Sequence, residues 1–387
     1  MSRIFGASLA FCVLTSLAQV RAGQIYFTDP GYGDQVSRIR TDGTDLDPIV
    51  TFPTIADPRA LAIDRANGRA FFSSGSTLQR INLDGTGLTS LGPAGGSVPS
   101  DIVLDMSAEN MYWSVEGTAG IKRATLDGAG ATTLVSQGIL DALVGVDPLV
   151  RADDVHSIAL DRIGGRIYWS NGRHLNSMPA GGASGPSDAV HHFELAGPGE
   201  INKIKLDLES GGVFWTNATG SLVQKSSLSG GDQTTLVSRG FGRPAGLAID
   251  FNAGQLYFGD TLGTNGRGQI LSADIDGGKA VLVYDSFSTL FAPADLEFGP
   301  GAVLAGDTND DQRVDIVDLN HVRNNFGRVG DGLAGDVNDD QQVGIDDLNS
   351  VRNNFGAGSI TPVPEPATIA LGIVGLVAAI ASARRRA

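Results

Sequence analysis

A pair of adjacent aromatic residues recurs six times between residues 26 and 258, and this repeat limits the possible folds more than any other feature of the chain. The first residues of successive doublets lie 45, 41, 56, 46 and 43 residues apart. This is the period of a propeller blade built from four short strands. The doublets and the residues after them are Tyr26-Phe27-Thr28-Asp29, Phe71-Phe72-Ser73-Ser74, Tyr112-Trp113-Ser114, Tyr168-Trp169-Ser170-Asn171, Phe214-Trp215-Thr216-Asn217 and Tyr257-Phe258-Gly259-Asp260.

Each repeat also carries signals for further strands. A short alternating strand that ends in Asp precedes five of the doublets. A second strand with a Gly turn follows the doublet, and a short run such as residues 133–136 comes last. Four strands per repeat is therefore the simplest count. The alternating strands before the doublets are residues 60–64, 101–105, 157–161, 203–207 and 246–250.

The two ends of the array complete one another. The first doublet, at Tyr26, has no alternating strand before it, whereas residues 294–298 form such a strand with no doublet after it. Pairing these two pieces builds the sixth blade from both termini and leaves no open sheet edge. The sequence therefore predicts a mainly β fold, with a six-bladed β-propeller over residues 23–303. A seven-bladed ring or another β-solenoid is the alternative.

The motifs resemble the YWTD repeat, also called the low-density-lipoprotein-receptor class B repeat, over about residues 24–300. The Asp of that motif is kept only at Asp29 and Asp260. The resemblance implies a ring that binds proteins or peptides on one face and does no chemistry. Because Trp113, Trp169 and Trp215 share one motif position, we expect them to pack between blades rather than to stack on a ligand.

Two near-identical segments, residues 306–327 and 335–356, follow the propeller at an offset of 29 residues. Each carries oxygen-bearing side chains at positions 1, 3, 5 and 12 of a loop, which is the ligand spacing of an EF-hand-like calcium loop. We therefore predict two calcium ions as cofactors, and an Asp/Asn-rich solvated turn is the alternative. The predicted metal positions are Asp307, Asn309, Asp311, Arg313, Asp315 and Asp318 in the first loop, and Asp336, Asn338, Asp340, Gln342 and Asp347 in the second.

The duplicated loops resemble those of dockerin modules, which carry two such loops, each followed by one helix, and which plug into cohesin domains. The resemblance implies a small α-helical module over residues 304–358 and a cohesin-like partner. Apolar residues at helical spacing after each loop predict one buried face per helix. These residues are Leu319, Val322 and Phe326, and then Leu348, Val351 and Phe355.

Two departures from the EF-hand pattern affect the predicted loops. Position 6, commonly Gly, is Gln312 in one loop and Gln341 in the other. A left-handed backbone at a residue other than Gly costs about 1 kcal/mol. Position 9 is Asp315 in the first loop and Gly344 in the second, where a water must substitute. We therefore expect the second site to be the weaker one.

Both ends of the chain carry targeting signals. Arg3, the apolar run 4–17 and the small-residue site before Gly23 predict a signal peptide over residues 1–22. The single cysteine, Cys12, lies inside it, so disulfides, thiol catalysis and cysteine-ligated zinc are excluded from the mature chain.

At the other end, an apolar run over residues 367–383 and three arginines follow the sorting motif Pro364, Glu365 and Pro366. This arrangement resembles the PEP-CTERM sorting signal of Gram-negative and related bacteria, which an exosortase is thought to process. We predict a linker and a sorting or transmembrane segment with a C-terminal hydrophobic helix over residues 359–387. A plain membrane anchor is the alternative.

Charge and histidine placement bear on function. With 28 basic and 43 acidic residues, the net charge of −15 makes nucleic acid an unsuitable partner and cations suitable ones. An enzyme would need acid/base residues at matching blade positions near the axis, but the histidines occupy unrelated repeat positions. His191-His192 is assigned to a loop insertion over residues 179–199. The carboxylates worth testing are Glu116, Glu194 and Glu200.

The sequence thus predicts an exported, cell-surface or matrix-associated binding protein with no catalytic residues. The propeller would take a protein or glycan ligand, the calcium-loaded module a cohesin-like partner, and the C-terminal segment would contact the membrane. The alternative is a component of a polysaccharide-degrading, cellulosome-like assembly, with glycoside or lactone hydrolysis on the propeller.

Overall fold

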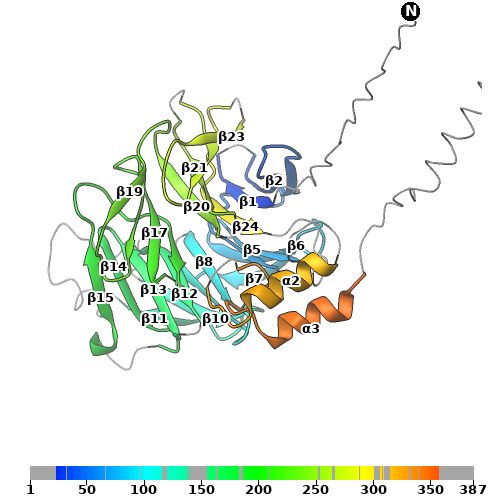
Figure 1. Cartoon of the computed structure of the whole chain (residues 1–387). Coiled ribbons are helices and arrows are strands. Elements are labelled where there is room, and N and C mark those ends of the chain that lie inside the picture. The colour runs from blue at the N-terminus through cyan, green and yellow to red at the C-terminus, as the bar shows by residue number, and fades with distance from the viewer. Residues whose placement is uncertain are drawn as a thin grey trace, which may run out of the picture.

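The described chain forms a ring of six sheets with two helices packed beside it (Figure 1). The computed structural model describes residues 23–356, apart from residues 32, 66, 97, 116–119, 137–138, 140–154, 163, 183–185, 209, 252, 264–265, 287, 300–305, 307, 309–313, 331–332 and 339.

Every sheet is a blade of four antiparallel strands, and the predicted alternating strand is always the innermost one. Two blades are β4 (Leu61–Asp64), β5 (Arg69–Ser74), β6 (Thr77–Asn82) and β7 (Thr89–Pro93), then β8 (Pro99–Asp105), β9 (Asn110–Val115), β10 (Ile121–Thr125) and β11 (Thr132–Val135). The next is β12 (Val155–Asp161), β13 (Arg166–Asn171), β14 (His174–Pro179) and β15 (Val190–Glu194), with a 3-10 turn, η1 (Pro186–Asp188), before β15. Two more are β16 (Ile204–Asp207), β17 (Gly212–Asn217), β18 (Leu222–Ser227) and β19 (Thr234–Val237), then β20 (Pro244–Asp250), β21 (Gln255–Asp260), β22 (Gln269–Asp274) and β23 (Val281–Asp285).

The sixth blade is assembled from both ends of the ring, as the sequence predicts. Its inner strand is β24 (Asp295–Gly299), which pairs antiparallel with β1 (Gln24–Asp29), followed by β2 (Gln35–Arg40) and β3 (Asp47–Val50). Gln24 lies opposite Gly299, and Thr28 lies opposite Asp295. The six-bladed prediction is confirmed, and the seven-bladed alternative is wrong for the described residues.

The aromatic doublets supply the packing between blades. Trp113, Trp169 and Trp215 are at most 1% exposed, and Trp113 packs against Ala60 and Phe71 of the preceding blade. Burying an aromatic side chain of this size is among the largest single contributions to a β core. The prediction that these residues pack rather than bind ligand is confirmed by their position.

A hydroxyl after the doublet links adjacent blades. Thr28 accepts a hydrogen bond from the Asp295 backbone at 3.1 Å and donates one to the Arg59 carbonyl of the next blade at 2.9 Å. The same pair of bonds recurs at Thr216. The Thr of the motif is therefore a structural residue of the ring at these two blades.

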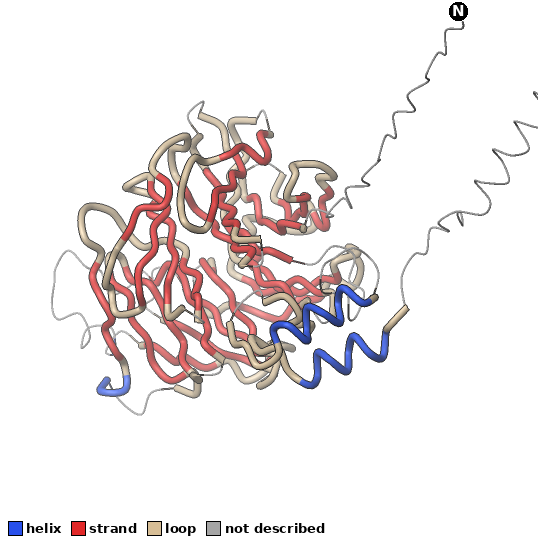
Figure 2. The backbone as a smooth tube through the Cα atoms, in the orientation of Figure 1, coloured by secondary structure: helices blue, strands red, loops and turns tan. Residues whose placement is uncertain are grey.

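Beyond the ring, α2 (Ile316–Asn325) and α3 (Ile345–Asn354) each follow one of the duplicated loops (Figure 2). Val322 and Val351 are fully buried, as predicted, but Phe326 and Phe355 are 53% and 54% exposed, so their assignment to the buried face is wrong. Each Phe follows the last helical residue, and its ψ of about 125° has left the helical range, which turns its side chain off the helical stripe. The small core consists of Val314, Val322, Leu333, Val343 and Val351.

No helix in the described part of the chain has the length and apolar character needed to span a membrane. The predicted hydrophobic helix over residues 367–383 lies outside the described residues, as do the signal peptide and the sorting motif.

Candidate functional site

The inner strands surround the propeller axis, and their first motif position carries charge at alternate blades. The Lys203 ammonium lies 2.5 Å from an Asp101 oxygen and 2.6 Å from an Asp295 oxygen. These three side chains come from separate blades and are at most 7% exposed. The six equivalent residues are Ala60, Asp101, Ser157, Lys203, Gly246 and Asp295.

Backbone donors complete the bonding of this cluster, which we call the axial triad (Asp101, Lys203 and Asp295). Asp101 accepts from the N–H of Ile158 at 2.9 Å, and Asp295 accepts from the N–H of Leu61 at 2.9 Å. The triad therefore ties together inner strands that are not neighbours in the ring. Paired and hydrogen-bonded charges of this kind can stay buried.

The electrostatics of the triad follow from two carboxylates sharing one ammonium. Burial raises the pKa of Asp295 to about 7, against the opposing attraction of Lys203. Burial also acts to lower the pKa of Lys203, but the charges of Asp101 and Asp295 outweigh it and raise that pKa above its ordinary value. The triad thus holds its ammonium charged while one carboxylate titrates near neutrality.

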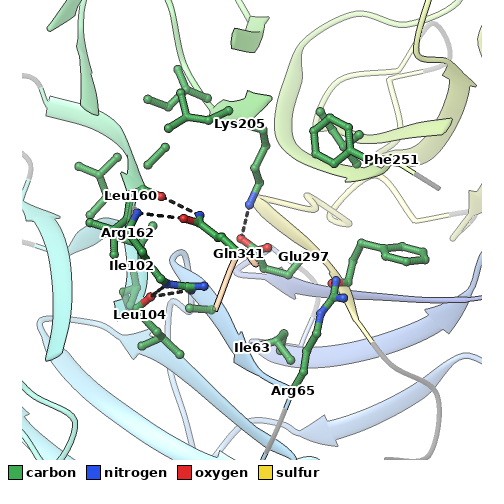
Figure 3. Close-up of a pocket in the computed structure, with 18 residues that line it drawn as sticks. Ile63, Arg65, Ile102, Leu104, Leu160, Arg162, Lys205, Phe251, Glu297 and Gln341 are labelled. Atoms are coloured by element: carbon green, nitrogen blue, oxygen red, sulfur yellow. Dashed lines mark hydrogen bonds and ion pairs between the residues drawn. The ribbon is translucent and has the colours of Figure 1, made fainter. Parts of the chain in front are cut away.

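Two residues further along the inner strands, a second ion pair crosses the axis. Lys205 lies 2.5 Å from Glu297, and both side chains are about one fifth exposed. The other blades place small or branched apolar residues at this level, which leaves a cavity of about 130 Å³ (Figure 3). Its lining includes Ala62, Val103, Ala159, Lys205, Glu297 and Gln341.

The rim of this cavity, the axial mouth, is held by two arginines. Arg162 donates through Nε and Nη2 to the Leu104 carbonyl at 3.1 and 2.8 Å. Arg65 donates to the Phe298 carbonyl at 2.6 Å and lies over the Phe298 ring. Both guanidinium groups therefore bind backbone of an adjacent blade, and this gives the axial mouth a fixed shape.

Among the described residues of the C-terminal module, Gln341 is the one that lines the axial cavity. Gln341, only 2% exposed, donates from Nε2 to the Leu160 carbonyl at 2.8 Å and accepts at Oε1 from the Arg162 N–H at 2.9 Å. Figure 3 shows this side chain beside the Lys205–Glu297 pair. The second duplicated loop is thus in direct contact with the propeller axis.

The second loop is closed by the Asp347 carboxylate. Its oxygens accept hydrogen bonds from the backbone N–H of Val337 and Gly344, each at 2.7 Å, and of Asn338 at 3.2 Å. Burial raises the pKa of this carboxyl, and the bonded amides oppose that shift. Position 12 of the predicted loop therefore lies at its centre.

The other predicted positions of the second loop also bond within it. Asp336 accepts from the N–H of Asp340 at 3.1 Å and of Gln341 at 2.9 Å. Asp340 accepts from the N–H of Gln342 at 2.9 Å and from the Asn338 amide at 3.1 Å. The structure thus brings Asp336, Asn338, Asp340, Gln342 and Asp347 into one turn.

Part of the first loop can be compared with the second. Asp318 accepts from the N–H of Thr308 and of Asp315, each at 2.7 Å. Asp315 in turn accepts from the Val317 N–H and caps α2. This repeats the arrangement around Asp347. The predicted positions Asp307, Asn309, Asp311 and Arg313 lie outside the described residues.

The donor chemistry of these loops suits a hard dication, since carboxylate and amide oxygens are the ligands that calcium takes. In the structure the oxygens accept backbone N–H groups. Among the described residues, no three His, Cys, Asp or Glu side chains gather into a group that could hold a metal ion. Calcium binding stays a prediction.

Two of the carboxylates considered for catalysis lie close to an arginine or a histidine side chain. Glu194 pairs with Arg173 at 3.0 Å, and Glu200 lies 4.0 Å from His156. Glu116 is outside the described residues.

The assignment of His191-His192 to a loop insertion is wrong. Both residues lie in β15, where His191 pairs with Asn176 across the blade. His192 stacks on Tyr168 with ring centroids 5.2 Å apart, and burial lowers the pKa of both imidazoles. The longest connection between consecutive blade strands lies instead between β11 and β12.

The axial residues are the functional candidates that sequence reasoning missed. A signal for them exists in the aligned inner strands, where three of the six blades place a small residue at the first position and four place Ala or Val at the third. The exceptions are Asp101, Lys203 and Asp295 at the first position, and Lys205 and Glu297 at the third. No comparable signal marks Gln341, whose partners are about 180 residues away in sequence.

Comparisons with known proteins cover the ring and the tail. A family model described as the PEP-CTERM protein-sorting motif matches residues 362–386. Low-density lipoprotein receptor-related protein 1 of Pyricularia oryzae is 24% identical over 279 residues, which is 63% of this chain and 86% of that protein. A human low-density lipoprotein receptor-related protein 5-like protein is 26% identical over 154 residues, 39% of this chain and 54% of that protein.

Among solved structures, the nidogen/laminin complex has a chain that matches with a TM-score of 0.57 at 17% identity, covering 71% of this chain and 97% of that one. TolB from Acinetobacter baumannii matches with a TM-score of 0.52 at 12% identity, covering 72% of this chain and 67% of that one. These similarities show the fold. The chain therefore contains a six-bladed propeller similar to those of lipoprotein-receptor-related proteins and nidogen, and its PEP-CTERM motif indicates export, with exosortase processing at the C-terminus toward the cell envelope.

Proposed function

We propose that this chain is a non-enzymatic binding protein of the cell envelope, whose propeller takes a protein ligand at the axial mouth. The observation that carries the proposal is the pairing of charge along the axis. Lys203 is neutralised by Asp101 and Asp295, and Lys205 by Glu297. Groups held in mutual ion pairs give a preformed binding surface, whereas acid/base catalysis needs a group within reach of the substrate proton.

Three of the matches named above support the same reading, because two are receptor-related proteins and one is the nidogen/laminin complex. What such proteins bind does not fix the ligand of this chain. The ligand is argued from the mouth itself, where a cavity of about 130 Å³ admits one side chain of a larger partner rather than a polysaccharide chain. The polysaccharide-degrading alternative therefore has less support.

Envelope proteins captured by the purified chain, cross-linked and identified by mass spectrometry, test the binding proposal. Val103→Trp fills the cavity and should abolish capture of a specific ligand. Val190→Trp, on the exposed outer strand β15, is the matched control and should leave capture unchanged. Equal capture by both variants would show that the ligand does not bind at the axial mouth. Turnover of glycosides or lactones by the parent, lost in Val103→Trp, would favour the hydrolase reading.

We further propose that the module binds two calcium ions and docks a cohesin-like partner. Calcium is supported by the oxygen donors at positions 1, 3, 5 and 12 of both loops. A docking surface is supported by apolar residues that recur on both helices, with Ile316 and Ile345 exposed by 57% and 59%. Duplicated exposed apolar positions of this kind are typical of interaction sites.

Isothermal titration of the full mature chain tests the calcium proposal. We expect two sites with dissociation constants of about 10⁻⁴ to 10⁻³ M, typical of extracellular modules. Asp318→Asn should remove the first site and Asp347→Asn the second, because each loses the charge at position 12 while keeping an oxygen acceptor. If calcium gives no heat of binding with the parent, or if both variants give the same heat as the parent, the loops are not calcium sites.

A further inference from the structure

The second loop carries an unusual residue at the point where it meets the propeller. Gln341 has a φ of +67°, a left-handed conformation that Gly adopts without strain. Its N–H is held by Asp336 at 2.9 Å, so the loop fixes the backbone while the side chain points away from it. Gly would suit this backbone conformation, but the Gln341 side chain makes a contact that Gly could not make.

That contact is specific for a primary amide. The Leu160 carbonyl lies in β12 and the Arg162 N–H lies one residue past its end, on the inner edge of the blade, where no strand pairs with β12. Backbone groups at such spacing point the same way and present one acceptor beside one donor. A carboxamide offers the complementary donor and acceptor, whereas a carboxylate would face the Leu160 carbonyl with a negative oxygen and no proton.

The contact also closes the axial mouth. Gln341 lines the same cavity as Lys205 and Glu297 and is almost fully buried, so the docked module occupies the entrance to the axis from this end. Gln341 narrows this entrance, so an external ligand has to compete with its side chain for the Leu160 and Arg162 backbone.

We propose that the second loop is an internal ligand of the propeller, with the Gln341 carboxamide occupying the axial mouth, so that the docked module and an external ligand exclude one another. This inference rests on the binding function proposed for the mouth. The chain then exists as docked and undocked states, and its apparent affinity for an external ligand is reduced by the undocked fraction. A partner that engages the module would raise that fraction and open the mouth.

Lysine acetylation of the full mature chain tests the docking without any external ligand. Lys205 lies inside the occupied cavity, and Lys279 on the exposed surface is an internal control. We expect Gln341→Gly and Gln341→Glu to raise the acetylation rate of Lys205 about tenfold, with Lys279 unchanged. Asn353→Ala, at an exposed position of α3, is the matched control and should behave like the parent.

A second measurement separates undocking from damage to the module. Cysteines introduced as Ala108→Cys on the propeller and Arg352→Cys on α3, both exposed positions, carry spin labels for distance measurement. The parent should give one narrow distance distribution, and Gln341→Gly should broaden it while the helix content stays constant. A Lys205 rate and a distance distribution that both stay parental in the two Gln341 variants would overturn the proposal. If these variants undock and yet no ligand binds the opened mouth, the internal docking stands and the proposed ligand function fails alone.

Discussion

Lys203 holds two carboxylates at the centre of the ring, where water cannot replace it. Its neighbours Asp101 and Asp295 are each 1% exposed, so removing the ammonium leaves two buried charges in repulsion. The arrangement is costly to assemble and much more costly to break.

We predict that Lys203→Met lowers the free energy of unfolding by about 3 to 5 kcal/mol. Lys205→Met, which breaks the partly exposed pair with Glu297 two residues further on, should cost only about 1 kcal/mol. Urea denaturation of both variants at neutral pH checks the comparison. Similar small losses in the two variants would mean that the axial triad contributes no more than a surface pair.

Asp295 also predicts a pH dependence. Its folded pKa of about 7 lies above the ordinary value of 3.8, so the folded state binds the proton more tightly than the unfolded state does. Stability is therefore highest below pH 4 for this group, falls by about 1 kcal/mol per pH unit as the pH rises, and levels off above pH 7. The test is the difference in unfolding free energy between the parent and Asp295→Asn, which cannot titrate, from pH 4 to pH 8. A difference that is flat across this range contradicts the prediction.

At residue resolution the sequence predicts packing better than it predicts the axis. The burial of the tryptophans follows from their shared motif position. By contrast, the sequence does not explain why Gly259 stands where the other blades have Thr or Ser. A Cβ at Gly259 would lie 2.3 Å from the Pro293 carbonyl, so this blade gives up the linking hydroxyl to admit the loop before β24. That approach depends on where the chain closes the ring, and a local motif does not encode it.

The ring depends on β24, the strand that closes it. Leu296 is fully buried among Ile25, Phe27 and Phe291, so it packs the last strand against the first. Residues from the two ends of the ring thus share one cluster.

We predict that Leu296→Ala destabilises the chain by about 2 to 5 kcal/mol through loss of apolar contact and the cavity left behind. Leu290→Ala, at a position 62% exposed a few residues earlier, should change stability by less than about 0.5 kcal/mol. Thermal unfolding followed by circular dichroism measures both. Equal melting temperatures for the two variants would show that β24 adds little to the ring.

The number and order of elements could be read from the sequence, because period-2 alternation and the doublets act locally. The errors fall where packing between elements decides. Val190 and Phe193 are three residues apart, which is not the period-2 spacing of a strand, and the histidine pair between them favours a loop. Pairing with β14, through an irregular register, makes this segment the strand β15. Phe326 fits the helical spacing of α2 but lies one residue past its end.

At the scale of the whole molecule, we expect the C-terminal tail to determine processing after export independently of the propeller. Replacing Pro364, Glu365 and Pro366 by alanines should leave export intact and stop exosortase processing, because the apolar run still inserts while the recognised motif is lost. Immunoblots of cell fractions compare the mature size and location. A variant indistinguishable from the parent in both would remove the role of the motif.

The contact between the module and the propeller could not be predicted from the sequence. The loops, the helices and the left-handed cost at position 6 could all be predicted from residues 306–356 alone. The partners of Gln341, Leu160 and Arg162, belong to a different domain, and nothing local in either segment marks the pair.

The pairing of Gln24 with Gly299 places the two covalent ends of the ring on neighbouring strands. A closed ring of equivalent blades has no physical first blade, so the chain could be circularly permuted. A short peptide joining residue 299 to residue 24 would span one strand spacing, and new termini could open at an exposed turn such as the one between β6 and β7. Folding of the ring therefore does not require the ends at their present position, and we expect the permuted ring to fold as the parent does. The present position of the C-terminal end does fix where the module is attached.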